Sequence, residues 1–334
     1  MITHQALGIN IMATAAQLKA LVKAHFDGQN DLFNSCVLQI AAHEAKQGHG
    51  ALAVALKKIL DSGRNRVFYE KISVPQELNG LVMTEESNVS KASLVIPEEL
   101  AERLNRIIHE YRQKSKLKSH GLTNRRKILL TGPSGTGKTM TAKMLAHELS
   151  LPLNTIQVDR LVTKFMGETS SKLRQIFEFM ATFSGVYLFD EFDAIGGDRA
   201  LENDVGEMRR ILNSFLQFIE QDKSESIILA ATNNPKLLDN ALFRRFDDIL
   251  YYSHPDKNSR AQLINNVLNG FSPLNCDWDK LLDYSNSLSH AEITAACLDA
   301  IKQTILNDSK RVAFQELLQA ISYRKINHTD DRAE

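Results

Sequence analysis

The spacing of hydrophobic residues changes from a helical period to a strand period along this chain. Before residue 67, apolar residues recur at helical spacing in three segments, which predicts helices from Thr14 onward, from about Asp31 to Gln47 and from about Ala51 to Leu60. Glycines follow the second and third segments, as is typical of helix ends. Residues 1–66 therefore predict a small all-α N-terminal module.

The next segment, residues 67–95, has no strong period. It contains Pro75, Gly80 and a polar stretch over residues 84–93, a composition that predicts a linker or a loosely packed connection. Pro97 then opens a helical pattern, since proline suits the first turn of a helix. We expect a new domain to begin at about residue 96.

From residue 127, short apolar runs alternate with helical patterns. This alternation predicts a parallel β-sheet covered by helices on both faces. The predicted strands are Lys127–Thr131, Leu153–Val158, Val186–Asp190, Ile227–Ala231 and Asp248–Tyr252. After Pro255 only helical patterns follow, the clearest of them opened by a capping box of Ser289 and Glu292. The sequence thus predicts a large α/β domain over residues 96–255 and a helical C-terminal lid over residues 256–334.

Composition excludes several classes of protein. Among 334 residues, 40 basic side chains balance 40 acidic ones, which argues against a protein whose main task is to coat nucleic acid. The three cysteines lie far apart without metal-ligand spacing, as expected of reduced thiols. No apolar run approaches the length of a membrane span. We therefore predict a cytoplasmic protein.

Basic residues cluster at 112–118 and 125–127. A nucleic-acid surface would interleave such charges with aromatic side chains for base stacking, and these segments do not. The sequence therefore favours a solvated helix end at these residues over a nucleic-acid surface.

The most informative motif follows the first strand of the α/β domain. Residues 132–139 fit the pattern G-x-x-x-x-G-K-[ST] between a buried strand and a helix, which is the context that a phosphate-binding loop requires. Glycines turn consecutive N–H groups toward one anion, the helix directs its positive dipole end there, and the lysine adds a full charge. We expect a nucleoside triphosphate to bind to Gly132, Pro133, Ser134, Gly135, Thr136, Gly137, Lys138 and Thr139.

A second chemical signal is the strand that ends in Asp190 and Glu191. Open parallel sheets bind their ligands at the carboxyl ends of the strands, so both acids are expected beside the phosphate loop. Asp190, with the Thr139 hydroxyl, is predicted to hold Mg²⁺, and Glu191 to polarise the attacking water. The fold class is therefore α/β, a P-loop NTPase sheet with a helical lid.

From about residue 95 to 310 the chain resembles the AAA ATPases, especially single-ring members such as katanin, spastin and the membrane-protein extractors. Five motifs in order carry this resemblance. Besides the phosphate loop, residues 163–169 look like the first pore loop of the family, 190–195 like its Walker B segment, 230–235 like its sensor 1 strand, and 238–247 like the end of its second region of homology.

The resemblance implies a catalytic role for three further residues. Asn233 would lie between the γ-phosphate and the catalytic water, donating to one and accepting from the other. Arg244 and Arg245 would reach the site of a neighbouring subunit as arginine fingers and offset the charge of the transition state. Here the two arginines are adjacent, whereas the family often separates them by Pro-Gly, so the sequence leaves open which is the main finger.

Phe165, Met166 and Gly167 match the pore loop of the family. As core residues at a turn they would be unremarkable, but the glycine and the polar neighbours favour an exposed loop. Repeated around a ring, such an aromatic grips an extended polypeptide by apolar contact.

Two other positions depart from the pattern of the family. Ser134 replaces a common proline in the phosphate loop, with little expected effect. His290 stands where the family commonly has glycine against the adenine, and we interpret it as an exposed first-turn residue rather than a new catalytic group.

Taken together, these features predict an ATP-driven protein remodeller or unfoldase. It would act as a homo-oligomer, a hexamer by resemblance, with a protein substrate and with a separate protease or adaptor docked on the N-terminal module, because the sequence has no H-E-x-x-H or G-x-S-x-G protease motif. The alternatives are a DNA-handling AAA ATPase and a nucleotide-gated switch with negligible turnover.

Overall fold

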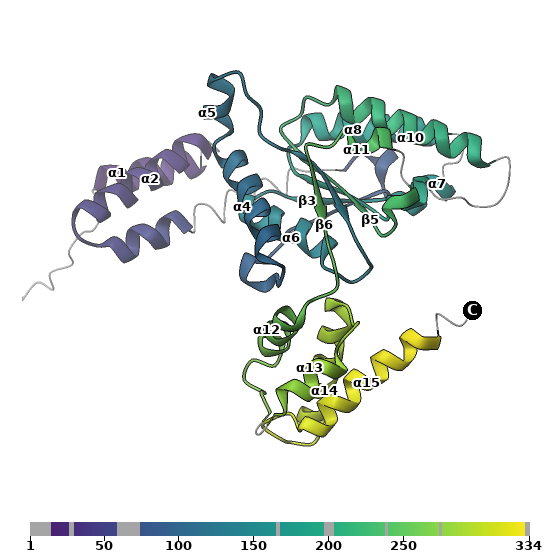
Figure 1. The fold of residues 1–334 in the computed structure, drawn as a ribbon. Coiled ribbons are helices and arrows are strands. Elements are labelled where there is room, and N and C mark those ends of the chain that lie inside the picture. The colour runs from purple at the N-terminus through teal and green to yellow at the C-terminus, as the bar shows by residue number, and fades with distance from the viewer. Residues whose placement is uncertain are drawn as a thin grey trace, which may run out of the picture. The chain divides into compact units, whose positions relative to one another are not determined.

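The computed structural model describes residues 15–26, 30–58, 74–164, 168–196, 204–237, 240–273 and 276–330. The chain divides into two compact units, Met1–Ser73 and Val74–Glu334. Figure 1 shows the elements of both units along the chain. No helix among the described residues is long and apolar enough to cross a membrane.

The first unit is helical, as expected. It contains α1 (Ala15–Phe26), α2 (Asn30–Lys46) and a helix over residues 50–58. The buried side chains include Ala24 of α1 and Ile40 of α2, and α1 contacts α2. The carboxylate of Glu44 is fully buried and lies 2.8 Å from Nδ1 of His49, so an ion pair or hydrogen bond joins α2 to the turn before the third helix.

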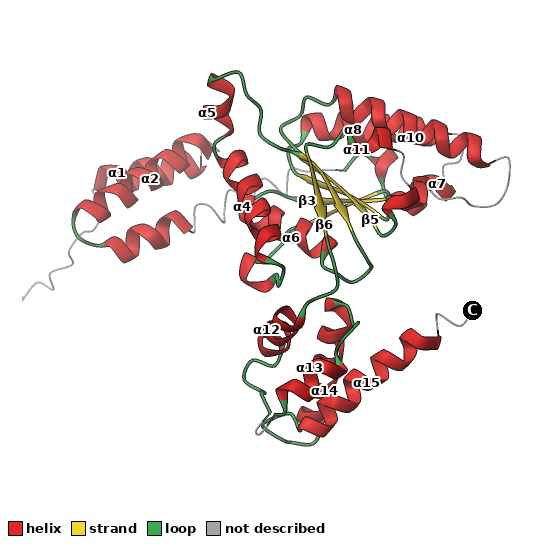
Figure 2. Cartoon of the chain, viewed as in Figure 1, coloured by secondary structure: helices red, strands yellow, loops and turns green. Residues whose placement is uncertain are grey.

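The second unit is built on a six-stranded sheet in the order β1-β3-β4-β5-β2-β6. Figure 2 draws the strands of this sheet in yellow. All neighbouring pairs are parallel except β1 with β3. The strands are β1 (Val82–Glu85), β2 (Lys127–Thr131), β3 (Leu153–Gln157), β4 (Val186–Asp190), β5 (Ile227–Thr232) and β6 (Asp248–Tyr251). Five of them lie where the apolar runs predicted strands, with ends shifted by no more than a residue.

Strand β1 was not expected, because it falls inside the segment interpreted as a linker. It pairs antiparallel with β3 from Val82 opposite Ile156 to Glu85 opposite Leu153. The prediction of a loose connection is therefore wrong for these residues. An edge strand of four residues with one face toward solvent shows too little alternation of apolar and polar residues to be recognised in the sequence. It forms because its backbone pairs with that of β3.

Strand β4 contributes alternate side chains to the cores on the two faces of the sheet. In β4, Val186 and Leu188 belong to the core beneath α4 (Glu98–Arg112) and α6 (Lys138–Leu149). On the other face, Phe189 packs against Phe177 of α8 (Thr169–Thr182) and Phe215 of α10 (Asp204–Gln221). Figure 1 shows these helix pairs on opposite sides of the sheet. Both faces are thus covered, and the polar ends of the strands are left to form a site.

Shorter helices connect these elements. They are α5 (Lys114–Ser119), α7 (Val158–Lys164), α9 (Asp193–Gly196) and α11 (Asn240–Phe243), with 3-10 turns at Gln76–Leu78, Lys91–Ser93 and Pro235–Leu237.

The helices after the sheet form their own core. They are α12 (Lys257–Val267), α13 (Trp278–Tyr284), α14 (His290–Leu306) and α15 (Phe314–Asp330). Leu281, Leu288, Ile293 and Leu317 are fully buried within it. The capping box predicted at the start of α14 is confirmed, since Glu292 N–H donates to Ser289 Oγ while Ser289 N–H donates to a carboxylate oxygen of Glu292.

The basic cluster around α5 is engaged in ion pairs. Lys114 and Lys118 lie 2.6 and 2.7 Å from the two carboxylate oxygens of Glu225, and Arg126 pairs with Asp222. These ion pairs favour the interpretation of a solvated helix end. They also neutralise basic side chains that a nucleic-acid site would need for phosphate groups. The hydrogen bonds from Lys114 and then Lys118 lower the pKa of Glu225 to about 2.

Replacing Glu225 with Gln is expected to lower the free energy of unfolding at pH 7 by less than about 1 kcal/mol, since exposed pairs are screened by solvent and salt. Because the folded pKa is depressed, this contribution is present above the ordinary value of 4.5 and is lost as the pH falls toward 2. Urea unfolding of both proteins across this range measures this contribution. Glu86→Gln is the control, because Glu86 is an exposed acid away from the Lys114–Glu225–Lys118 cluster. A stability difference that stays constant down to pH 2 would contradict the assignment.

Candidate nucleotide-binding site

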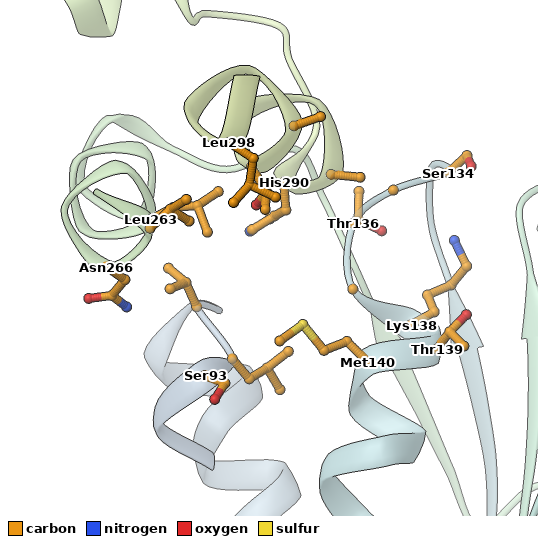
Figure 3. Close-up of a pocket in the computed structure, with 18 of the residues that line it drawn as sticks. Ser93, Ser134, Thr136, Lys138, Thr139, Met140, Leu263, Asn266, His290 and Leu298 are labelled. Carbon is orange, nitrogen blue, oxygen red and sulfur yellow. The ribbon is translucent and has the colours of Figure 1, made fainter. Parts of the chain in front are cut away.

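A cavity of about 1160 Å³ opens within the second unit. The phosphate-loop residues Ser134–Thr139 and the strand-end residues Asp190, Glu191 and Asn233 line one part of it, and residues 92–95, α12 and α14 line another. Figure 3 shows Lys138 and Thr139 at one side and Leu263, His290 and Leu298 at another. The cavity therefore joins the loop that suits phosphates to an apolar chamber.

The backbone of the loop requires glycine at its first position. Gly132 has φ +149°, and a Cβ there would lie 2.2 Å from the carbonyl oxygen of Tyr252. No side chain fits at that distance, so glycine lets the loop begin directly against the residue after β6. Tyr252 also binds the loop side of α6, where its hydroxyl lies 2.7 Å from Thr141 Oγ1.

Gly135 brings the loop into contact with the lid. Its φ is +72°, a Cβ there would lie 2.7 Å from Ser289 Oγ, and its carbonyl oxygen accepts a hydrogen bond from Ala291 N–H at 3.0 Å. The first turn of α14 is thus bonded to the phosphate loop. The phosphate loop and the lid helix are therefore in direct contact.

Lys138 is held at the mouth of the loop. Its Nζ donates to the carbonyl oxygens of Gly132 and Pro133 at 2.7 and 2.8 Å. Burial lowers the pKa of Lys138, and the carboxylates of Asp190 and Asp193 act in the opposite direction. Lys138 is the first residue of α6, and these contacts place its ammonium group where it can reach a phosphate.

Thr139 and Asp190 meet across the gap between α6 and β4. The Thr139 hydroxyl donates to Asp190 Oδ2 at 3.0 Å, and both residues line the cavity. Two oxygen donors beside a phosphate loop suit Mg²⁺, which takes few protein ligands and completes its shell with phosphates and water. The described residues contain no cluster of three or more His, Cys, Asp or Glu that would instead hold a metal by protein ligands alone.

Glu191 and Asn233 line the same cavity at the ends of β4 and β5, and both are exposed. Glu191 has φ +52°, a left-handed conformation that costs energy in a residue with a side chain. Its N–H donates to Asp190 Oδ1 at 3.0 Å, which keeps the two acids in a tight turn. The structure thus brings Lys138, Thr139, Asp190, Glu191 and Asn233 to one cavity, and the chemical roles expected of them remain predictions.

His290 differs from the expectation of an exposed residue. Its ring lines the cavity (Figure 3), and both ring nitrogens are shielded from solvent. Burial lowers the pKa of His290, a hydrogen bond with the backbone of Val95 opposes this shift, and the charge of nearby His254 adds to it. The helical period placed His290 in the first turn of α14, but only the packing of that turn against the loop directs the ring inward.

The two candidate fingers lie outside the lining of this cavity. Arg244 and Arg245 follow α11, and both are exposed. Arg245 pairs with Glu220 of α10, whereas the described residues offer Arg244 no hydrogen bond or ion pair. The adjacent arginines, which the sequence could not distinguish, therefore differ in their surroundings.

The predicted pore loop, Phe165, Met166 and Gly167, lies outside the described residues. Helix α7 ends just before it at Lys164 and α8 begins just after it at Thr169.

The apolar walls of the cavity were missed by sequence reasoning. They include Leu94, Leu263, Val267 and Leu298, which come from three separate segments. In the sequence, each of these residues looks like an ordinary apolar position of its own segment. Only the folded lid makes them neighbours, so no motif could have revealed them.

Comparison with known proteins agrees with this site. The model of the ATPase family associated with various cellular activities (AAA) matches residues 128–254. An uncharacterized AAA family ATPase of Sinorhizobium fredii is 32% identical over 93% of this chain and 95% of its own length. A 26S proteasome regulatory subunit homolog of Methanothermobacter thermautotrophicus is 31% identical over 60% of this chain and 56% of its own.

Two further similarities extend the comparison. The ATP-dependent zinc metalloprotease FtsH 1 of Methylacidiphilum infernorum is 30% identical over 76% of this chain, which spans 41% of that protein. A crystal structure of the FIGL-1 AAA domain superposes with a TM-score of 0.60 and 22% identity, covering 76% of this chain and 90% of that one. The structural similarity concerns the fold alone.

Proposed function

Because the chain belongs to the AAA family and is an ATPase, we propose that it is an ATP-driven protein remodeller that threads polypeptide through the pore of a hexameric ring. The observation that carries this proposal is the cavity, in which Lys138, Asp190, Glu191 and Asn233 converge. On this proposal these residues form the machinery for hydrolysis within one subunit, except for a group that offsets the charge of the transition state. A neighbouring subunit would supply that group.

Within the cavity, the residues divide the reaction among them. The loop N–H groups and Lys138 bind the phosphates, and Thr139 and Asp190 would hold Mg²⁺, which offsets the charge of the β- and γ-phosphates when bound. Glu191 accepts a hydrogen bond from the attacking water and draws its proton. Asn233 orients that water toward the γ-phosphate, because its amide both donates and accepts.

Arg244 is proposed as the main finger. An arginine that serves a neighbouring subunit must be exposed and must keep its guanidinium available, and Arg244 meets both conditions. Arg245 is instead turned toward Glu220 of its own chain. The pair therefore combines a finger with a residue that anchors the segment after α11.

The threading step depends on Phe165, which we place on the pore loop by its motif. Replacing Phe165 with Ala is expected to leave basal ATP hydrolysis largely unchanged and to slow remodelling by about thirtyfold, since removing an aromatic anchor costs on the order of 2 kcal/mol of grip. The measurement is unfolding of a fluorescent protein with an unstructured tail, run beside ATP hydrolysis. Phe165→Tyr, which keeps the aromatic ring, is the matched control. Equal loss of both activities in Phe165→Ala would refute this division of labour.

A partner protease or adaptor is proposed for the N-terminal module. The relative from Methylacidiphilum infernorum is named as a protease as well as an ATP-dependent enzyme, and this chain matches less than half of it. This sequence has no zinc-protease helix motif, so degradation would need a second protein. The first unit, which is separate from the ATPase unit, is the part available to bind such a partner.

A further inference from the structure

The segment that carries Arg244 is tied to the start of strand β2. Oδ2 of Asp247 accepts hydrogen bonds from the backbone N–H groups of Arg126 and Lys127, each at 2.9 Å. The N–H of Asp247 donates in return to the carbonyl oxygen of Lys127 at 2.7 Å. A carboxylate is a stronger acceptor than a neutral group, so Asp247 forms a firm link between the finger segment and β2.

Strand β2 is a rigid support for this link. It lies between β5 and β6 in the sheet, and the side chains of its residues 128–130 are fully buried. The β2–β6 ladder begins at Ile128 opposite Asp248, and the backbone bond of Asp247 extends it toward the finger segment. The other end of β2 leads into the phosphate loop at Gly132. Asp247 therefore fixes where the chain enters β6 relative to the strand that carries the loop.

Arg244 lies between two anchored points. On one side, Leu242 is fully buried and its carbonyl oxygen accepts a hydrogen bond from Arg245 N–H at 3.0 Å. On the other side, Phe246 is buried directly before Asp247. The Arg244 side chain is exposed, and no described residue forms a hydrogen bond or ion pair with it. The backbone is thus held while the guanidinium stays available.

The ion pair between Arg245 and Glu220 is a weaker anchor. The two side chains are 40% and 56% exposed, and exposed pairs contribute little because solvent and salt screen them. Asp247 is exposed too, but its partners are main-chain groups of a strand in the sheet, which cannot rotate away as a side chain can. Of the two contacts, the one made by Asp247 sets the position of the segment.

We propose that Asp247 is a positioning residue for Arg244 and holds the finger segment in the geometry in which the guanidinium reaches the nucleotide site of the neighbouring subunit. A charged group stabilises a transition state best when it is already in place, because ordering a loose segment during the reaction opposes the gain. Asp247 does not line the nucleotide cavity of its own chain, so it acts through Arg244 alone. The inference rests on the proposed role of Arg244 as a finger between subunits.

Two variants separate the anchoring of the segment from the charge of the carboxylate. Asp247→Ala removes the acceptor, and Asp247→Asn keeps an oxygen in its place without the charge. In steady-state hydrolysis, kcat of Asp247→Ala is expected to fall about 10- to 100-fold, the loss caused by misplacing a catalytic group by about 1 Å. Asp247→Asn retains most of the rate. Equilibrium binding of ATP is unchanged in both variants, because the cavity is intact.

Mixed assemblies show on which side of the subunit interface the defect lies. A Glu191→Gln subunit has an intact finger segment, so mixing it with Asp247→Ala restores hydrolysis at the sites of the Asp247→Ala subunits. Mixing Asp247→Ala with Arg244→Ala gives no recovery beyond the average of the two proteins, since neither subunit supplies a well-placed finger. A general loss of structure in Asp247→Ala would leave both mixtures inactive.

Three results would overturn the inference. They are an unmodified rate in Asp247→Ala, a rate in Asp247→Asn as low as in Asp247→Ala, and no recovery with Glu191→Gln although sedimentation shows that the subunits assemble. If Asp247→Ala does not fold, judged by circular dichroism, Asp247→Ser takes its place in the same mixtures, because its hydroxyl is too short to bond both N–H groups.

The same measurements distinguish this inference from the proposed function. A normal rate in Arg244→Ala would remove the finger itself and the role of Asp247 with it. A slow Arg244→Ala beside a normal Asp247→Ala would overturn the role of Asp247 alone and leave Arg244 as the finger.

Discussion

Replacing Glu191 with Gln is expected to slow ATP hydrolysis by about 10²- to 10⁴-fold while ATP still binds, because the amide keeps the shape of the side chain and cannot take the proton from water. Glu191 lines the cavity but makes no contact that holds the phosphate loop, which is built by Gly132, Pro133 and Lys138. Single-turnover hydrolysis measures the chemical step, and equilibrium binding measures retention of ATP.

The matched control for this variant is Glu178→Gln. Glu178 is an exposed acid on α8 that does not line the cavity, so the same change of charge there leaves hydrolysis unchanged. Glu191→Gln is also expected to accumulate ATP-bound assemblies, which sedimentation detects. A Glu191→Gln protein that turns over ATP at the unmodified rate would remove Glu191 from the mechanism.

Replacing Arg244 with Ala is expected to lower the rate of hydrolysis by about 10³- to 10⁵-fold, the range found for arginine fingers. Arg245→Ala is the matched control, since it removes an identical charge one residue away whose guanidinium is engaged with Glu220. The measurement is steady-state ATP hydrolysis at several protein concentrations, because a finger supplied by a neighbour makes the rate per subunit rise as subunits associate.

Mixing two inactive variants tests whether the finger acts between subunits. A Glu191→Gln subunit retains Arg244, and an Arg244→Ala subunit retains Glu191, so interfaces between them contain complete sites. Partial recovery of hydrolysis on mixing is therefore expected. If the mixture stays inactive, or if Arg244→Ala hydrolyses ATP normally as a single subunit, the assignment of Arg244 to a neighbouring site is wrong.

The family, the ATPase activity and the α/β fold with its helical lid were predicted from the sequence and are confirmed. Sequence analysis succeeded where the residues of a motif are neighbours in the chain. The phosphate loop is a single segment between β2 and α6, and Asp190 and Glu191 end one apolar strand, so their context can be read locally. The start of α14 was visible for the same reason, since a capping box spans only four residues.

Other features could not be found in this way. Strand β1 exists because β3 offers it an edge, and the pairing joins residues about 70 positions apart. The adjacent arginines were equivalent until the structure placed Glu220 beside Arg245. His290 was expected to face solvent, but its side chain lines the cavity. The reason is that the first turn of α14 packs on the phosphate loop, where Ala291 N–H donates a hydrogen bond to the carbonyl oxygen of Gly135.

The sequence by itself determined which chemical groups this protein carries and in what order, because a phosphate loop and a strand that ends in two acids need only neighbouring residues. The tertiary structure decided which of these groups share a cavity, which arginine remains available, and that an imidazole enters the nucleotide chamber. Those outcomes depend on contacts between segments far apart in the chain. The sequence of each segment, taken by itself, is compatible with several such contacts.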